Sequence, residues 1–248
     1  MWEALRKRTV AIPAPRFEGR LASFASQAMA VAAKDLRAEL RTKETASVTF
    51  VFALLVLVIF NFAFDLRAGD NRTLAGPGIL WVSITLGAMM GLSHVFSKER
   101  EQGSIEGLLL CPVDRSAIYV GKFAAALLLT AAVELAILPP FALFTDLSVF
   151  LPPLLLTVTL GTIGFVAVGT LFSAMAVHTR TRELMLPLLV LPVAIPIIVA
   201  AIEGTRVGFE GKPWSDMLPW ITILTAFDAV FLILCPWLFQ YVMEEMGS

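Results

Sequence analysis

Few residues of this 248-residue chain have the types and spacing that catalysis or metal binding requires. It contains two histidines and two cysteines, which stand far apart: His94, Cys111, His178 and Cys235. No pair has the spacing of a zinc site, a redox motif or a heme-attachment motif. We also find no Ser-His-Asp arrangement in the sequence. The sequence therefore predicts no metal site and no catalytic centre.

The Gly121-Lys122 pair is the part of the sequence closest to a phosphate-binding loop. Such a loop needs a glycine five residues earlier and a serine or threonine directly after the lysine. Here Ser116 and Phe123 occupy those two places. We therefore expect that the chain is not an enzyme, and that any ATP hydrolysis it uses comes from another chain.

Two carboxylates, Glu134 and Asp228, lie within long apolar runs. An ionisable group inside a membrane span is costly, so each is a candidate functional residue. They could line a shared polar pathway or bind a partner subunit. The alternative is that each hydrogen-bonds a neighbouring helix and stabilises packing. We favour the structural alternative.

The elements that must position these residues follow from composition. Hydrophobic residues make up 58% of the chain and charged residues 16%, and the mean hydropathy is +0.81. A soluble domain has about a quarter charged residues. The apolar runs are continuous and do not alternate, which favours membrane helices over a barrel. The predicted fold class is an all-α polytopic membrane protein.

Six apolar runs are long enough to cross a bilayer, which takes about 20 helical residues. They lie at 45–64, 78–97, 117–140, 151–178, 184–203 and 218–243. Three prolines, at 187, 192 and 196, interrupt the fifth run and predict a kinked or flexible helix. Gly161, Gly164 and Gly169 in the fourth run predict close helix packing.

The orientation of the spans follows from lysine and arginine. Fifteen of these residues fall in the first 44 residues and in the connections 98–122 and 179–183, whereas the other connections hold four. Positive charge collects on the cytoplasmic side of a membrane protein. We therefore expect a multi-pass protein of the bacterial inner membrane with both termini in the cytoplasm. The net charge of −1 does not suggest a nucleic-acid partner.

The region before the first span divides into an N-terminal extension, 1–18, and an amphipathic interfacial helix within 19–44. Its apolar arc includes Leu21, Phe24 and Leu36. Asp35 and Glu39 intrude on that arc, so they either pair with basic groups of another subunit or reach out to solvent. A six-helix permease domain, 45–243, and a short cytoplasmic tail, 244–248, complete the predicted domains.

The cytoplasmic segment 98–112 is rich in charge at its start and then turns apolar. Ser104 can cap a short helix that Pro112 ends. A short helix with one apolar face could dock into a groove of a cytoplasmic partner, or it could be an ordinary surface loop. The residues alone leave both alternatives open.

This segment resembles the coupling region of type-2 ABC transporter permeases. The matching residues are Glu99, Glu101, Gly103, Ser104, Ile105, Glu106, Leu108, Leu109 and Pro112, followed by Gly121 and Lys122. Within that class the chain is similar to the CcmB family, heme exporter protein B, because of GSIEGLLLCP and the proline-spaced LMLPLLVLPVAIPIIVAA. In this class 98–112 contacts the ATPase subunit, and 19–44 corresponds to the elbow helix.

The resemblance implies a permease subunit for c-type cytochrome biogenesis. ATP hydrolysis by a CcmA-like subunit would drive heme export or the release of a heme-loaded chaperone. It also implies CcmC-like and CcmD-like proteins and a second permease copy, with heme as cargo and no cofactor assigned to this chain. Two alternatives remain: a generic type-2 exporter permease for a lipid, drug or glycan, and a membrane scaffold without transport.

Overall fold

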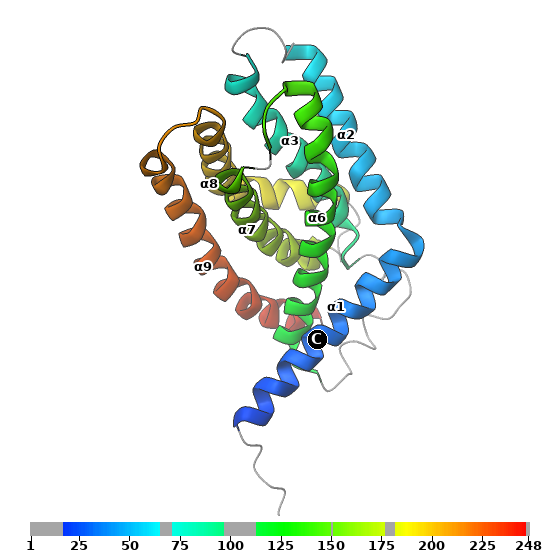
Figure 1. The fold of residues 1–248 in the computed structure, drawn as a ribbon. Helices are drawn as coiled ribbons and strands as arrows, with labels where there is room; N and C mark the ends of the chain where they lie inside the picture. The colour runs from blue at the N-terminus through cyan, green and yellow to red at the C-terminus, as the bar shows by residue number, and fades with distance from the viewer. Residues whose placement is uncertain (1–16, 65–70, 97–112, 150, 177–181, 247–248) are drawn as a thin grey trace, which may run out of the picture.

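The computed structural model describes residues 17–64, 71–96, 113–149, 151–176 and 182–246. In these ranges every regular element is a helix. The helices, with the labels of Figure 1, are α1 (Phe17–Thr42), α2 (Glu44–Phe64), α3 (Asn71–Ser93), α6 (Arg115–Thr145), α7 (Pro152–Ala176), α8 (Arg182–Phe209) and α9 (Trp214–Met246). The predicted all-α fold class is confirmed.

Six of the described helices, α2, α3, α6, α7, α8 and α9, are long and apolar enough to cross a membrane. Each coincides with one predicted run, so the number and order of the spans are confirmed. Three of the helices, α6, α8 and α9, extend past the predicted runs at both ends, because polar residues continue the hydrogen-bonded backbone outside the hydrocarbon. The largest difference is at α3, which begins at Asn71 and contains Pro77.

The helix predicted before the first span is α1, which is 26 residues long. The division of the chain into extension, interfacial helix, permease domain and tail stays a prediction. Figure 1 shows α1 crossing one end of α6 obliquely, whereas α2 leaves that corner along the bundle. The turn between α1 and α2 is a single residue, Lys43, in the left-handed conformation with φ 53°.

The centre of the bundle is α7, which packs against α3, α6, α8 and α9. It is the most deeply buried of the six long helices. In contrast, α2 packs only against α1, α3 and α6 among the principal contacts of the described helices. A stripe of apolar side chains on α2 therefore faces away from the bundle: Val48, Val51, Leu55, Ile59 and Phe62. Such a stripe suits contact with lipid.

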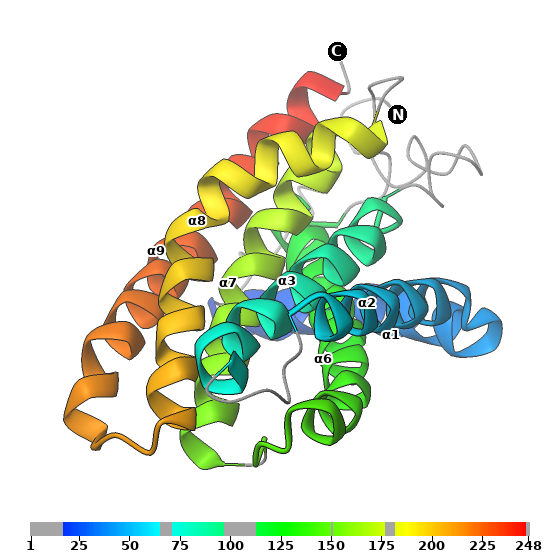
Figure 2. The ribbon, with the colours of Figure 1, turned by 90° about the horizontal axis from the view of Figure 1, so that it is seen from above.

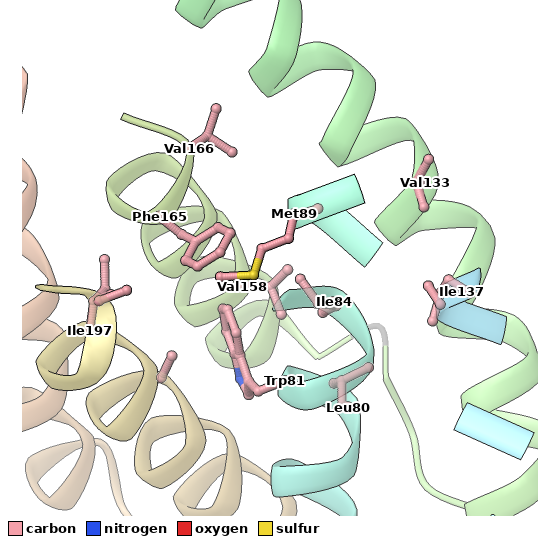
Figure 3. Close-up of a cluster of buried hydrophobic side chains, with 14 of the residues drawn as sticks. Leu80, Trp81, Ile84, Met89, Val133, Ile137, Val158, Phe165, Val166 and Ile197 are labelled. Carbon is pink, nitrogen blue, oxygen red and sulfur yellow. The ribbon is translucent and has the colours of Figure 1, made fainter. Parts of the chain in front are cut away.

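The main hydrophobic core lies where α3, α6, α7 and α8 meet (Figure 3). Trp81 of α3 is almost fully buried there, beside Val158 and Phe165 of α7. Its indole N–H donates to Thr205 Oγ1 of α8 at 2.9 Å. This bond matters because a buried indole donor without an acceptor is costly. The core thus joins the centre of α7 to its neighbours.

The proline-rich fifth span forms one helix, α8, which contains Pro187, Pro192 and Pro196. Each proline removes a backbone donor and crowds the preceding turn. Figure 2 shows that α8 changes direction along its length. The predicted kink is therefore present.

Candidate functional site

The predicted coupling residues, from Glu99 to Pro112, lie outside the described residues. The structure does describe the chain on both sides of them. On one side α3 ends and is followed by 94–96, and on the other Asp114 caps α6. The Asp114 carboxylate accepts the backbone N–H of Ser116 at 2.9 Å, which fixes where α6 begins.

Lys122 lies eight residues into α6 and is the most buried charged residue among those described, with 1% of its surface exposed. Its ammonium group lies 3.1 Å from Asp35 Oδ2 of α1. It also donates to the carbonyl oxygen of Val95 at 2.8 Å, directly after α3. The ring of Phe96 lies 5.0 Å from the same nitrogen, within cation–π range. One buried charge therefore connects α1, α6 and the chain that leaves α3.

The glycine before this lysine allows α1 to approach α6 closely. A Cβ at Gly121 would lie 2.6 Å from the Ala28 carbonyl oxygen and 2.7 Å from Val31 Cβ, both in α1. No side chain can occupy that space without moving the α1 backbone. We call the contact formed by Asp35, Val95, Phe96, Gly121 and Lys122 the α1 junction.

Asp35 and Glu39 of α1 both hold the helix to the rest of the chain. Asp35 also pairs with Lys34 at 3.1 Å. Glu39 Oε1 accepts the backbone N–H of Ala46 at 2.8 Å, in the first turn of α2. Neither predicted alternative for Asp35, a basic group of another subunit or solvent, included the intrachain pair with Lys122 that the structure shows.

Sequence reasoning missed the Asp35–Lys122 pair, although both residues carried a signal. Asp35 lies on the apolar arc of an amphipathic helix, and Lys122 lies inside an apolar run. When two residues of opposite charge each lie in an apolar stretch, they are candidates to form an ion pair with each other, because a buried charge needs a partner. Only the fold shows that residues 87 positions apart meet.

A cavity of about 290 Å³ opens beside this ion pair, between α1, α2, α3 and α6. Its lining combines charged and apolar side chains: Lys34, Asp35, Leu36, Glu39, Thr45, His94, Lys122, Ala125, Ala126 and Leu129. Both lysines face Asp35 at 3.1 Å. The pair with Lys34 lies within α1, whereas the pair with Lys122 joins α1 to α6.

His94, one of the two histidines, lies at the rim of that cavity and is exposed. Its Nδ1 lies 2.8 Å from the Met90 carbonyl oxygen, so this nitrogen carries the proton and donates. His178 and Cys111 lie outside the described residues, and Cys235 is buried in α9. No three His, Cys, Asp or Glu side chains of the described ranges gather as a metal site.

Glu134 of α6 is buried and accepts a hydrogen bond of 2.5 Å from Thr162 Oγ1 of α7. Asp228 of α9 is also buried, beside Gly164 of α7. Neither oxygen of Asp228 has a hydrogen-bond partner among the described residues. Thr162 and Gly164 are two residues apart and thus face nearly opposite sides of α7. The structure brings both carboxylates to α7 without bringing them together.

The three glycines of α7 are packing positions, as predicted. A Cβ at Gly161 would overlap Trp81, one at Gly164 would overlap Ile197 and the Asp228 carboxylate, and one at Gly169 would overlap Leu92. The absence of side chains at these positions lets α3, α8 and α9 approach α7 closely. A role of Glu134 or Asp228 in a pathway or in partner binding stays a prediction.

Two ion pairs lie near the connection between α8 and α9: Glu203 with Arg206 at the end of α8, and Glu210 with Lys212 in the connection itself. The Glu210 carboxylate accepts a hydrogen bond from Lys212 and raises the pKa of that exposed lysine. Both pairs are local in sequence and partly exposed, so they contribute little to the stability of the fold.

Comparison with known proteins supports one family. Heme exporter protein B of Pseudomonas aeruginosa is 29% identical over 195 residues, 78% of this chain and 87% of that protein. The proteins of the same name from Paracoccus denitrificans and Rhodobacter capsulatus are 29% and 28% identical over 82% and 79% of this chain, and over 92% and 90% of their own lengths. A family model described as CcmB protein matches residues 26–244. With its six long apolar helices, this multi-pass membrane chain belongs to the CcmB protein family.

Proposed function

We propose that this chain is the membrane permease subunit of an ABC transporter complex for c-type cytochrome biogenesis. The observation that carries the proposal is the family match over residues 26–244, with relatives named heme exporter protein B along most of their length. The six long apolar helices suit a permease. The complex exports heme, or it uses ATP to release a heme-loaded chaperone.

The energy comes from a separate CcmA-like ATPase, because this sequence has no phosphate-binding loop. That subunit binds segment 98–112 through Glu99, Glu101, Glu106 and their neighbours. CcmC-like and CcmD-like proteins and a second permease copy complete the complex. The chain lies in the bacterial inner membrane with both termini in the cytoplasm, which its lysine and arginine distribution supports.

The proposal is tested in a bacterium from which the chromosomal copy is deleted. Complementation with the wild-type chain should restore heme-stained c-type cytochromes. The double substitution Glu101→Ala and Glu106→Ala should abolish this rescue and the permease-dependent part of ATP hydrolysis in the reconstituted complex. The control is Asp216→Asn, which changes an exposed carboxylate in the first turn of α9, near the outer connection.

Each alternative has its own outcome. A generic exporter of lipid, drug or glycan predicts normal c-type cytochromes in the deletion strain. A scaffold without transport predicts that the double substitution leaves ATP hydrolysis and cytochrome formation unchanged. ATP-dependent appearance of heme inside inverted vesicles distinguishes heme export from chaperone release.

A further inference from the structure

The α1 junction includes Val95 and Phe96, which directly precede 97–112, the range that contains the segment proposed to meet the ATPase. Val95, whose carbonyl oxygen accepts from Lys122, comes two residues before 97–112. Asp114, which caps α6, comes two residues after it, and its backbone N–H donates to Gln27 Oε1 of α1 at 3.3 Å. One helix, α1, is therefore tied to both ends of the segment.

The tie to Lys122 is directional. An apolar contact between helices tolerates sliding, whereas an ammonium group held by a carboxylate at 3.1 Å and a carbonyl at 2.8 Å does not. Because Lys122 is 1% exposed, its ammonium group depends on these protein partners for the interactions that water provides at the surface. The close approach at Gly121 leaves no room for a side chain between the two helices.

From the junction the hydrogen bonds continue to the centre of the bundle. Tyr119, one turn before Lys122, donates its hydroxyl to the Ala167 carbonyl oxygen of α7 at 2.8 Å. Ser173 of α7 donates to the Leu92 carbonyl oxygen of α3 at 2.6 Å. Both bonds are buried, so the loss of either would leave a polar group without a partner in the core.

We propose that Lys122 is a positioning residue that clamps α1, the end of α3 and the start of α6 into one body, so that force applied to segment 97–112 reaches α7. This inference rests on the proposed function, in which the segment receives that force. Lys122 does not contact the ATPase itself, because it is buried within this chain.

The first experiment measures coupling in membranes that contain the whole complex, supplied with heme, an apocytochrome c and ATP. Lys122→Met keeps the length of the side chain and removes the charge. It should leave ATPase binding and ATP hydrolysis intact, and it should lower c-type cytochrome formed per ATP about tenfold or more, by loss of a buried pair. Lys122→Arg retains the charge and should restore most of that yield.

The matched control is Lys34→Met. Lys34 lines the same cavity and lies at the same 3.1 Å from Asp35, but it belongs to α1 itself and is half-exposed. It should leave the yield per ATP unchanged. Equal losses in Lys34→Met and Lys122→Met would overturn the proposal, as would a normal yield in Lys122→Met.

If Lys122→Met does not assemble, the double variant Asp35→Asn with Lys122→Met replaces the pair by uncharged groups, which often restores folding. The clamp predicts that this folded double variant still has the low yield. A normal yield in it contradicts the clamp. Failure of the proposed function gives a different result: the wild-type complex itself would form no cytochrome c with ATP.

The second experiment needs no cargo. Spin labels at Met29 of α1 and Leu128 of α6, both exposed, report the distance between the two helices in a chain whose two native cysteines are replaced. The clamp predicts one narrow distance with and without an ATP analogue, and a broadened distribution in Lys122→Met. A distance that changes with nucleotide in the otherwise wild-type protein would overturn the proposal.

Discussion

The α1 junction and the surroundings of α7 both bury ionisable side chains, but these side chains have very different partners in the two regions. At the junction, Lys122 meets a carboxylate, a carbonyl oxygen and an aromatic ring from other parts of the chain. Beside α7, Glu134 meets one hydroxyl, and Asp228 has no hydrogen-bond partner among the described residues. The polar groups therefore position the helices at the junction, whereas glycines determine how closely helices pack around α7.

The difference matters for how each region responds to substitution. A buried ion pair is sensitive to loss of either member, because the remaining charge keeps its desolvation cost. A tight glycine contact is sensitive to added volume and indifferent to charge. Loss of charge should therefore affect the junction strongly and the glycine contacts of α7 little, although added volume at Gly121 would also disturb the junction.

The largest effect is expected for Lys122→Met, which removes the buried ammonium group from the Asp35 carboxylate and from the Val95 carbonyl oxygen and leaves Asp35 with Lys34 alone. The free energy of unfolding, measured by SDS titration in mixed micelles, should fall by roughly 3 kcal/mol. Lys34→Met removes a half-exposed lysine from the same carboxylate and should change the free energy of unfolding by less than about 1 kcal/mol. Equal losses would show that the junction is no different from a surface ion pair.

The next largest effect is expected for Gly161→Ala. The added Cβ overlaps Trp81, whose indole is held by Thr205, so the ring cannot withdraw without losing a buried hydrogen bond. The free energy of unfolding should fall by about 2 kcal/mol.

Gly78→Ala is the control for this overlap, because a Cβ at Gly78 meets nothing within 4 Å. It should raise the free energy of unfolding by about 0.5–1 kcal/mol, since alanine loses less backbone entropy in a helix than glycine. If Gly78→Ala and Gly161→Ala both destabilise the protein, the loss in Gly161→Ala is not explained by the tight packing at α7.

A smaller effect is expected for Glu134→Gln and Asp228→Asn. The amide oxygen of glutamine can still accept from Thr162, and asparagine has nearly the shape of the aspartic acid side chain. We expect assembly of the complex, full c-type cytochrome formation and a change in the free energy of unfolding within about 1 kcal/mol. Loss of cytochrome with an intact complex would assign a functional charge to that carboxylate.

The smallest effect is expected for Lys43→Gly at the corner between α1 and α2. Lys43 has φ 53°, where a side chain costs about 1–2 kcal/mol and glycine does not, while glycine adds entropy to the unfolded chain. The net result should be a gain of about 0.5 kcal/mol. A loss of stability would show that the Lys43 side chain has contacts that outweigh the strain.

Hydrophobicity alone was enough to predict the six long helices, because twenty consecutive apolar residues have few alternatives in a membrane. The bend of α8 and the close packing at Gly161 and Gly164 also followed from residue type. These are local properties. They depend on the residue types within one segment, so that segment of the sequence is enough to predict them.

The partners of the charged residues could not be predicted from the sequence. Asp35 lies 87 positions from Lys122, and a carboxylate on an amphipathic arc has the same sequence signature whether it meets lipid headgroups, another subunit or its own chain. The placement of Glu134 and Asp228 on different faces of α7 likewise needed the packing of three helices.

By itself, then, the sequence determined the class of the protein, the number and order of its spans and the family it resembles, since all three depend on local composition and motifs. Only the tertiary structure decided that α1 is pinned to α6 by a buried lysine and that both ends of 97–112 are tied to α1. The physical reason is that a charge buried in a bilayer protein is stable only beside its counter-charge, and which residue supplies it depends on how the helices cross.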